Sequence, residues 1–324
     1  MNRNTTIDIA KGIGIFLVLW GHTQCAIKPY IYVFHMPLFF LLSGYVFNNK
    51  DSVIETFKKK IRSLGVPFLF FLVFQRIGFV IISLIDGTFK HSYLLVWTPI
   101  EPWGHIGVLW FFISLFTISI IFSMVNKIPS EIVKLVVCLL LTYIGYLLSN
   151  RNIHLPFKLG SSFSMVFLFY IGNKLRNLNM DIIKSFTSWF FLSLFSLVLF
   201  VFCLNWFLPI IDVSSNIFEG DFLISLAIMI LGCLMIISFS KLIGYIPYIK
   251  TAGVYIGQNS LTIFTTHPVV LGFIYLIYQR DKISDFGGLL ISFLMLGACL
   301  PLIILLKKFF PFVFGKKKPV SVNT

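Results

Sequence analysis

Long apolar runs recur along this chain, and short polar segments separate them. Several runs reach the roughly 18–20 residues that a helix needs to cross a bilayer, and in hydrocarbon such runs must be helical because the backbone finds no other hydrogen-bond partners. Hydrophobic residues make up 58% of the chain, charged residues make up only 12%, and the mean hydropathy is +0.93. A soluble protein could not cover its surface with so few charges. The sequence therefore predicts an all-α, polytopic integral membrane protein.

The apolar runs predict ten transmembrane helices. They cover residues 7–26, 30–48, 64–85, 106–126, 132–149, 161–178, 187–208, 221–240, 254–278 and 286–306. We expect one transmembrane domain over residues 1–310, followed by a basic cytoplasmic tail over 311–324.

The distribution of Lys and Arg predicts the orientation in the membrane. With the N-terminus placed in the cytoplasm, 19 of the 26 basic residues fall on the cytoplasmic side and 6 on the outer side. Because basic residues concentrate on the cytoplasmic side of membrane proteins, this split predicts both termini inside. The net charge of +14 then reflects topology and attraction to anionic membrane lipids, and no nucleic-acid partner is expected.

Ionisable residues inside the predicted helices are candidates for function, because burying them in lipid is costly. Lys11 and His22 are eleven residues apart, so they share one helix face roughly 16 Å apart along the axis. Asp8 flanks the same stripe. Counting residues along the helices places His22, His35 and His267 in one layer of the outer half of the bilayer.

Trp110 falls at a similar depth to these histidines. A single buried histidine can simply bond a neighbouring carbonyl, so a structural role is an alternative for each of them. A zinc site is disfavoured, because no His-x3-His pair and no acidic ligand accompany the histidines at this depth. No metal is therefore expected.

A second cluster, Lys58, Lys59, Lys60 and Arg62, enters the third predicted helix from the cytoplasm. It has two interpretations: an ordinary basic loop, or a clamp for the phosphates of an anionic substrate. Arg76 falls near the middle of that helix, which indicates a cavity, a ligand or a carboxylate beside it.

Five short motifs follow one another in a fixed order. They are Asp8, Lys11 and His22 with their spacing, the Phe-Phe-x-x-Ser-Gly-aromatic run at 39–45, the basic stretch ending in Pro at 58–67, the Trp-Phe-Phe sequence at 110–112, and the Gly-x-x-Ser-Leu-x-Ile-Phe-x-x-His sequence at 257–267. In this order they resemble the membrane-bound acyltransferase 3 family, which includes bacterial O-acetyltransferases of surface polysaccharides. The Phe-His-Met-Pro sequence at 34–37 is similar to the fucose 4-O-acetylase-like and intercellular-adhesin-type branch. Lys11 stands where the family more commonly has Arg, and lysine cannot form the bidentate contacts of arginine.

The resemblance implies an O-acyltransferase of the bacterial cytoplasmic membrane. Its donor would be a cytosolic acyl-CoA, usually acetyl-CoA, with succinyl-CoA as an alternative, and its acceptor a carbohydrate hydroxyl. On this hypothesis the CoA phosphates lie near the basic residues and the thioester reaches His22, which acts as general base or forms an acyl-histidine. The residues assigned to the donor are Lys11, Asp8, Arg62, Lys58, Lys59, Lys60 and Arg76, and those assigned to the acceptor or the oxyanion are His267, His35, Trp110, Asn259 and Ser260.

Two other functions fit the same features. Ten helices with buried polar groups also suit an exporter or flippase of polysaccharide or lipid-linked glycan, although the sequence shows no inverted repeat. A structural subunit of a synthase complex is a third possibility, and it predicts that replacing His22 has no effect on acyl transfer.

Overall fold

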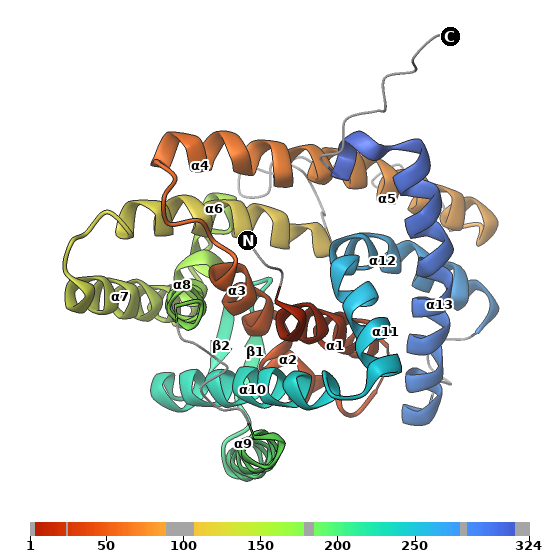
Figure 1. The fold of residues 1–324 in the computed structure, drawn as a ribbon. Coiled ribbons are helices and arrows are strands. Elements are labelled where there is room, and N and C mark those ends of the chain that lie inside the picture. The colour runs from red at the N-terminus through yellow and green to blue at the C-terminus, as the bar shows by residue number, and fades with distance from the viewer. Residues whose placement is uncertain (1–3, 24, 89–106, 178–184, 279–283, 315–324) are drawn as a thin grey trace, which may run out of the picture.

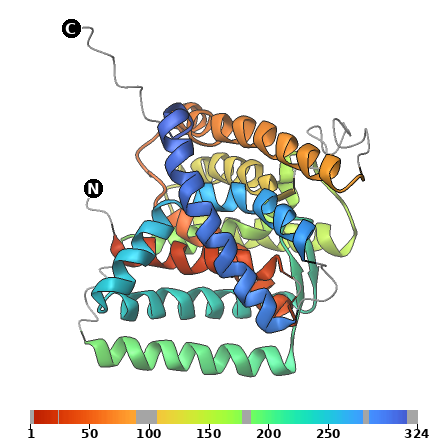
Figure 2. The same cartoon turned by 90° about the vertical axis from the view of Figure 1, so that its right-hand side faces the viewer.

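The computed structural model describes residues 4–23, 25–88, 107–177, 185–278 and 284–314. Most of these residues belong to helices, and the long helices run side by side between two faces of the molecule (Figures 1 and 2). The helices are α1 (Thr5–Gly21), α2 (Lys28–Tyr32), α3 (His35–Tyr45), α4 (Val53–Lys60), α5 (Val66–Ile85), α6 (Trp110–Val125), α7 (Glu131–Asn150), α8 (Leu159–Leu175), α9 (Phe186–Trp206), α10 (Phe222–Ile243), α11 (Pro247–Gln258), α12 (Ser260–Ile277) and α13 (Asp285–Phe309).

α1 begins and α13 ends on the same side of the molecule, on the left in Figure 2. We call this side the amino-terminal face and the other side the opposite face. A short π-helix over Ile61–Gly65 joins α4 to α5, and a 3-10 helix over Pro311–Phe314 follows α13. The first four residues of the predicted tail thus form a helical turn, while residues 315–324 lie outside the described residues.

Seven helices of the described residues are long and apolar enough to cross a membrane. Each of the ten predicted segments contains a helix. α1 and α8 have 17 residues and α3 has 11, which is short for a span, and α6, with 16, reaches span length only with the 3-10 helix Gly107–Leu109 before it. The segment predicted at 30–48 divides into α2 and α3 at Phe34, where the backbone leaves the helical region. The segment predicted at 254–278 divides at Asn259, whose side-chain amide donates to the carbonyl of Tyr255.

One feature departs from the all-α expectation. Between α9 and α10 the chain forms an antiparallel hairpin of β1 (Ile210–Asp212) and β2 (Ile217–Glu219), with Ile211 opposite Phe218. The hairpin lies at the opposite face, beside α2 and α7 (Figures 1 and 2). β-Branched isoleucines favour the extended backbone here, and the polar Ser214, Ser215 and Asn216 form the turn.

The outside of the bundle is apolar, as a lipid environment requires. α9 packs against α10 at the edge of the molecule and exposes more than half of Phe191, Phe195 and Phe202 (Figure 1). In water this surface would be costly, but lipid tails solvate it as well as protein does.

Glycines allow two pairs of helices to approach closely. A Cβ added at Gly44 of α3 would lie 1.9 Å from the carbonyl oxygen of Phe169, and one added at Gly172 of α8 would lie 1.8 Å from that of Leu41. α11 docks on α1 in the same way, because a Cβ at Gly257 would lie 1.7 Å from the carbonyl oxygen of Asp8. Such small-residue contacts drive helix association in membranes, where the hydrophobic effect does not.

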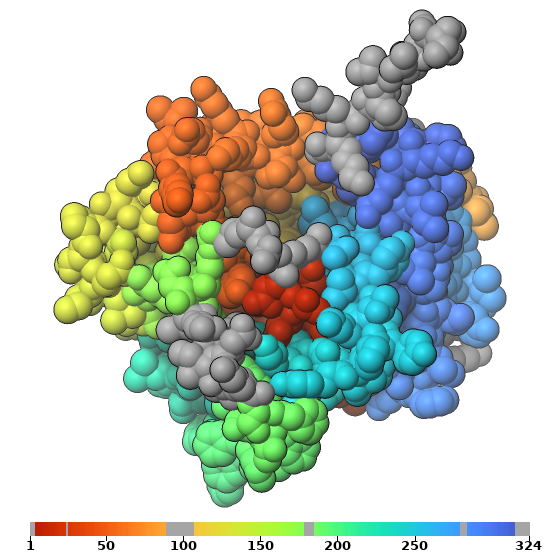
Figure 3. Space-filling model, viewed as in Figure 1, coloured from red at the N-terminus to blue at the C-terminus, as the bar shows by residue number. Residues whose placement is uncertain are grey.

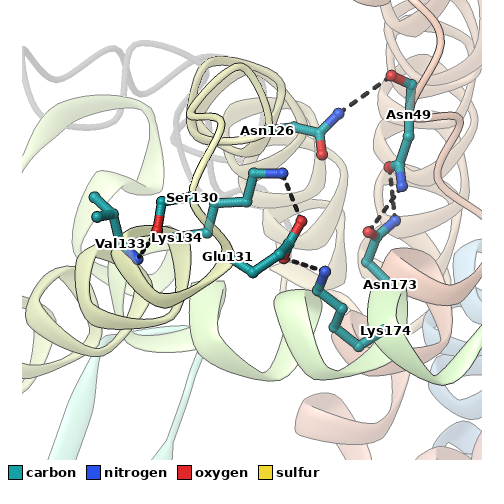
Figure 4. A network of polar contacts seen from close by, with 8 residues as sticks. All are labelled: Asn49, Asn126, Ser130, Glu131, Val133, Lys134, Asn173 and Lys174. Atoms are coloured by element: carbon teal, nitrogen blue, oxygen red, sulfur yellow. Dashed lines mark hydrogen bonds and ion pairs between the residues drawn. The ribbon is translucent and has the colours of Figure 1, made fainter.

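A polar network joins the helix ends at the amino-terminal face (Figure 4). Asn173 of α8 exchanges hydrogen bonds with the side chain of Asn49, whose carbonyl accepts from Asn126. Glu131, at the start of α7, pairs with Lys134 and with Lys174 of α8. α7 and α8 are therefore held together at this face, and the loop that joins them lies at the opposite face.

Candidate active site

The three histidines predicted to share one depth lie together in the structure. The ring of His22, at the end of α1, lies 4.8 Å from the ring of His267 in α12, edge to face. Tyr32 of α2 bridges to the third histidine, with its ring 6.3 Å from His22 and 4.8 Å from His35. We call His22, His35, His267 and Tyr32 the histidine cluster.

Backbone hydrogen bonds orient two of these rings. Nδ1 of His22 lies 2.7 Å from the carbonyl oxygen of Val18, and Nδ1 of His35 lies 2.9 Å from that of Ile31. Because a carbonyl only accepts, Nδ1 carries the proton in each ring, which leaves Nε2 as the basic nitrogen of the neutral imidazole. His35 is buried, whereas His22 is partly exposed. His22 therefore combines a fixed tautomer with access from outside.

His267 differs from the other two histidines. It is fully buried, and neither ring nitrogen makes a hydrogen bond of good geometry with any residue that the structure describes, although the carbonyls of Ile263 and Phe264 interact with the ring. An unsatisfied buried polar group costs about 1–3 kcal/mol, so a polar ligand atom reaching this ring would be stabilised.

Trp110 lies at the start of α6, and its described ring contacts are with phenylalanines. Its ring centroid is 6.4 Å from that of Phe40 and 6.0 Å from that of Phe111. Phe111 in turn contacts Phe264, whose ring lies 6.1 Å from His267. Trp110 thus supports the histidine cluster through other aromatic side chains.

A basic pocket of about 640 Å³ forms where α4, α5, α12 and α13 meet. Figure 3 views the amino-terminal face, where α4 and α13 lie on either side of the recessed start of α1. In this pocket the predicted basic cluster meets residues near the carboxyl end of the described chain, including Lys307. Its lining residues are Lys58, Lys59, Arg62, Ser63, Pro67, Phe71, Gln258, Asn259, Leu261, Thr262, Lys307, Val313 and Phe314.

Asn259, predicted to hold the acceptor or stabilise the oxyanion, lies in this pocket. Its side-chain oxygen accepts a hydrogen bond from Lys307 of α13. Its neighbour Gln258 donates to a carboxylate oxygen of Asp8 at 3.4 Å, so the start of α1 adjoins the pocket. Ser260, the first residue of α12, is half-buried beside them.

The basic cluster divides within one turn of helix. Lys58 and Arg62 line the pocket, and so does Lys59, whose ammonium is also 2.6 Å from Asp51. That hydrogen bond, with a further one from Asn48, holds the pKa of the Asp51 carboxyl below its usual range. Lys60 lies over the ring of Phe47, 5.9 Å from its centroid, and does not line the pocket.

The remaining donor candidates lie on the helices beside the pocket. Lys11 is half-buried on α1, and Arg76 is half-buried on α5. Gln75, next to Arg76, is buried and donates to the carbonyl of Thr265 at 2.7 Å, two residues before His267. This bond fixes α5 against α12 at the level of the histidine cluster.

α12 connects the two polar regions. Asn259 and Thr262 line the basic pocket, and His267 follows five residues later, which corresponds to about 7–8 Å along the helix. The pocket and the histidine cluster therefore lie close to each other along one helix.

Comparison with known proteins identifies the family of this chain. Residues 4–308 match the model of the acyltransferase 3 family, described as an acyltransferase domain. The chain belongs to the acyltransferase 3 family. It is therefore an acyltransferase, and its many long apolar helices indicate a multi-pass membrane protein.

Two curated relatives share part of this acyltransferase. The nodulation proteins NolL of Sinorhizobium fredii and of Mesorhizobium japonicum are 38% and 35% identical to it over 85 residues. Each alignment covers 21% of the acyltransferase and 23% of the relative, so the chain spans less than a quarter of the relatives' length. No solved structure matches the acyltransferase significantly.

The structure of the acyltransferase adds polar residues that sequence reasoning did not assign to the site. The sequence indicates Lys307 only as one of the basic residues of the cytoplasmic side, and it indicates no role for Gln258 within the motif at 257–267. Tyr32 could have been found from its spacing of three residues before His35, which places both on one side of the chain.

Asp212 of β1 gave no signal in the sequence. It is close enough to interact electrostatically with His22, His35 and Tyr32. Among the described residues, no group of three or more His, Cys, Asp or Glu side chains is arranged to hold a metal ion.

Proposed function

We propose that this acyltransferase moves an acetyl group from cytosolic acetyl-CoA to a hydroxyl of a bacterial cell-surface or exopolysaccharide sugar, or of its precursor. The observation that carries the proposal is that one helix, α12, lines the basic pocket and carries His267, whose ring lies 4.8 Å from that of His22. The amino-terminal face is then the cytoplasmic face, as the distribution of basic residues predicts.

The basic pocket is suited to the phosphates of the donor. Lys58, Arg62 and Lys307 come from three different elements, and phosphate oxygens accept strong charge-assisted hydrogen bonds from such cations. A volume of about 640 Å³ falls within the range of small-molecule sites. We assign this cation set to the donor, because the phosphates of CoA carry the opposite charge.

The pantetheine arm and its thioester would extend from this pocket along α1 and α12 toward the histidine cluster. Nε2 of His22 takes the proton of the acceptor hydroxyl as its oxygen attacks the thioester carbonyl carbon. The new C–O bond forms, the C–S bond breaks, and the imidazolium of His22 returns the proton to the departing CoA sulfur. The products are an acetyl ester and CoA thiol, and no electrons are gained or lost.

His267 complements His22 in this scheme. Its nitrogens make no well-formed hydrogen bond with the described residues, so an N–H of its ring is available to the developing oxyanion or to the acceptor hydroxyl. Tyr32 packs against His22, and His35 packs against Tyr32, so the two residues support the ring of His22.

The experiment is transfer of labelled acetyl from acetyl-CoA to glycan in membranes that contain equal amounts of wild type or His22→Ala protein. We expect transfer by the wild type and none by the variant. Transfer by neither protein, together with a loss of labelled glycan export, would instead identify an exporter. Equal transfer by both would show that His22 is not the base. Acid-quenched protein without acetyl label would favour direct attack over an acyl-histidine.

A further inference from the structure

A second, smaller pocket of about 250 Å³ lies at the opposite face, between the loop that joins α7 to α8 and the turn of the β hairpin. Six of its nine lining residues are polar, among them a lysine and a histidine, and none is acidic. The lining residues are Ile153, His154, Leu155, Lys158, Gly160, Ser161, Ser214, Ser215 and Asn216.

The backbone around this pocket is strained. All four non-glycine residues with positive φ in the described part of the chain lie in its two loops: Asn152, Phe157, Lys158 and Asn216, with φ between 52° and 55°. This conformation is unfavourable for Phe and Lys in particular, and strain of this kind concentrates at ligand sites when the surroundings hold it in place.

The surroundings do hold the pocket in place. Asn216 is buried, accepts from the hydroxyl of Ser164 at 2.7 Å and donates to the carbonyl of Gly145 at 3.1 Å. The hydroxyl of Ser149 accepts from the backbone N–H of Phe218 at 2.8 Å. The hairpin is thereby fixed to both α7 and α8, and the pocket is preformed.

Ser214 connects the lining of this pocket to Asp212 through hydrogen bonds. Ser214 lines the pocket, and both its N–H and its hydroxyl donate to Oδ1 of Asp212, at 2.9 and 2.6 Å. Asp212 in turn interacts electrostatically with His22 and Tyr32. A molecule held in the pocket is therefore one residue removed from Asp212, whose strand β1 packs against α2, the helix that carries Tyr32.

We propose that this pocket binds one sugar unit of the acceptor, and that the unit carries an anionic group, a carboxylate or a phosphate. The serine and asparagine side chains suit sugar hydroxyls, and Lys158 with His154 favours a negative charge. The volume is below the usual range for whole ligands, so it accommodates one unit of a longer chain. The role as an acceptor site rests on the proposed function, whereas binding itself does not.

The test measures binding of three probes to the full chain in nanodiscs without acetyl-CoA: a galacturonic acid tetramer, its carboxyl-reduced form, and galactose 6-phosphate. Lys158→Asn removes the charge with a residue that tolerates positive φ. Ser215→Leu fills the pocket from a half-exposed turn. Arg151→Gln is the control, because it removes a charge from the same loop without touching the pocket.

We expect at least one charged probe to bind wild type about tenfold more tightly than the neutral tetramer, a difference of about 1.4 kcal/mol. Lys158→Asn should abolish this preference, Ser215→Leu should weaken all binding, and Arg151→Gln should change nothing. Tighter binding of the galacturonic acid tetramer identifies a carboxylate as the anionic group, tighter binding of galactose 6-phosphate identifies a phosphate, and tighter binding of both shows that the pocket accepts either. Equal binding of charged and neutral probes, or an equal loss in Arg151→Gln, would overturn the proposal.

Acetyl transfer in the same preparations separates the two proposals. If His22→Ala transfers acetyl as well as wild type while binding follows the pocket variants, the proposed chemistry fails and the sugar site stands. If transfer requires His22 but binding ignores Lys158→Asn and Ser215→Leu, only the sugar site fails.

Discussion

The basic pocket and the histidine cluster are both polar, but their surroundings are opposite. The pocket opens at a face of the molecule and contains cations on flexible stems from α4, α13 and the π-helix between α4 and α5. The histidine cluster lies within the bundle, where the ring of Phe264 is 6.1 Å from that of His267 and His267 has no exposed surface. Charge recognition tolerates adjustable geometry, whereas proton transfer requires atoms held within hydrogen-bond reach. Substitutions in the basic pocket should therefore change the KM for acetyl-CoA, whereas substitutions in the histidine cluster should change kcat.

The largest effect should follow removal of the paired rings. We expect His22→Ala and His267→Ala each to lower kcat by about 10²–10⁴-fold, the range of general acid–base catalysis, with the KM for acetyl-CoA within about twofold of wild type. The double variant should be no slower than the slower single variant, because groups that act as a unit are not additive. Steady-state kinetics on all three proteins checks this. Independent, multiplicative losses would mean that the two rings do not act together.

Gly257→Ala should disturb both regions at once. The added Cβ would lie 1.7 Å from the carbonyl oxygen of Asp8, so α11 must move away from α1, carrying Gln258 and Asn259 with it. We expect a loss of about 1–3 kcal/mol of folding free energy, as for other overpacked sites, with a higher KM and a lower kcat.

Gly297→Ala provides the control for this substitution. It lies within α13, and nothing stands within 4 Å of its added Cβ. Alanine is the better helix former, so stability should hold or rise. Thermal unfolding in detergent distinguishes the two variants, and equal melting temperatures would contradict close packing of α1 against α11.

Arg62→Gln and Lys307→Gln should affect the donor alone. Each removes one pocket cation, and we expect the KM for acetyl-CoA to rise about tenfold, or about 1.4 kcal/mol, with kcat within threefold. Lys127→Gln is the matched control, since Lys127 is exposed and does not line the pocket. A fall in kcat at unchanged KM would place these cations with the chemistry and erase the distinction between the two regions.

The smallest effect should come from Lys60→Met. Lys60 belongs to the basic run but lies over Phe47 outside the pocket, so we expect the KM for acetyl-CoA to change by less than about twofold, as for residues away from a binding surface. Lys58→Met is the comparison variant, because Lys58 lines the pocket, and it should raise the KM for acetyl-CoA measurably. If the two variants behave alike, the run acts as a diffuse basic surface.

The positions of the histidines were predictable because regular helices convert sequence spacing into depth. Counting residues placed His22, His35 and His267 in one layer, and the structure brings the rings of His22 and His267 to 4.8 Å. The helix predicted over 254–278 is two helices, α11 and α12, and His267 is the eighth residue of α12. Its ring still lies beside that of His22.

For two candidate residues, contacts that the sequence does not show determine the surroundings of the side chain. Asn259 is predicted to hold the acceptor or stabilise the oxyanion, and in the structure its side chain lies in the basic pocket beside Lys307. Lys60 was grouped with its neighbours, but successive residues of a helix point in different directions, about 100° apart. Neither the position of the Asn259 side chain nor that of Lys60 follows from composition or motif order.

The sequence by itself determined the membrane class, the approximate helices and the motif residues, because bilayer thickness and backbone hydrogen bonding leave few solutions for long apolar runs. Tertiary structure decided which distant residues meet. Lys307 lines the basic pocket because α13 packs on α12. Asp212 lies near the helix that carries Tyr32 because the hairpin packs on α2. These contacts span most of the chain, and they depend on helix packing that no local pattern encodes.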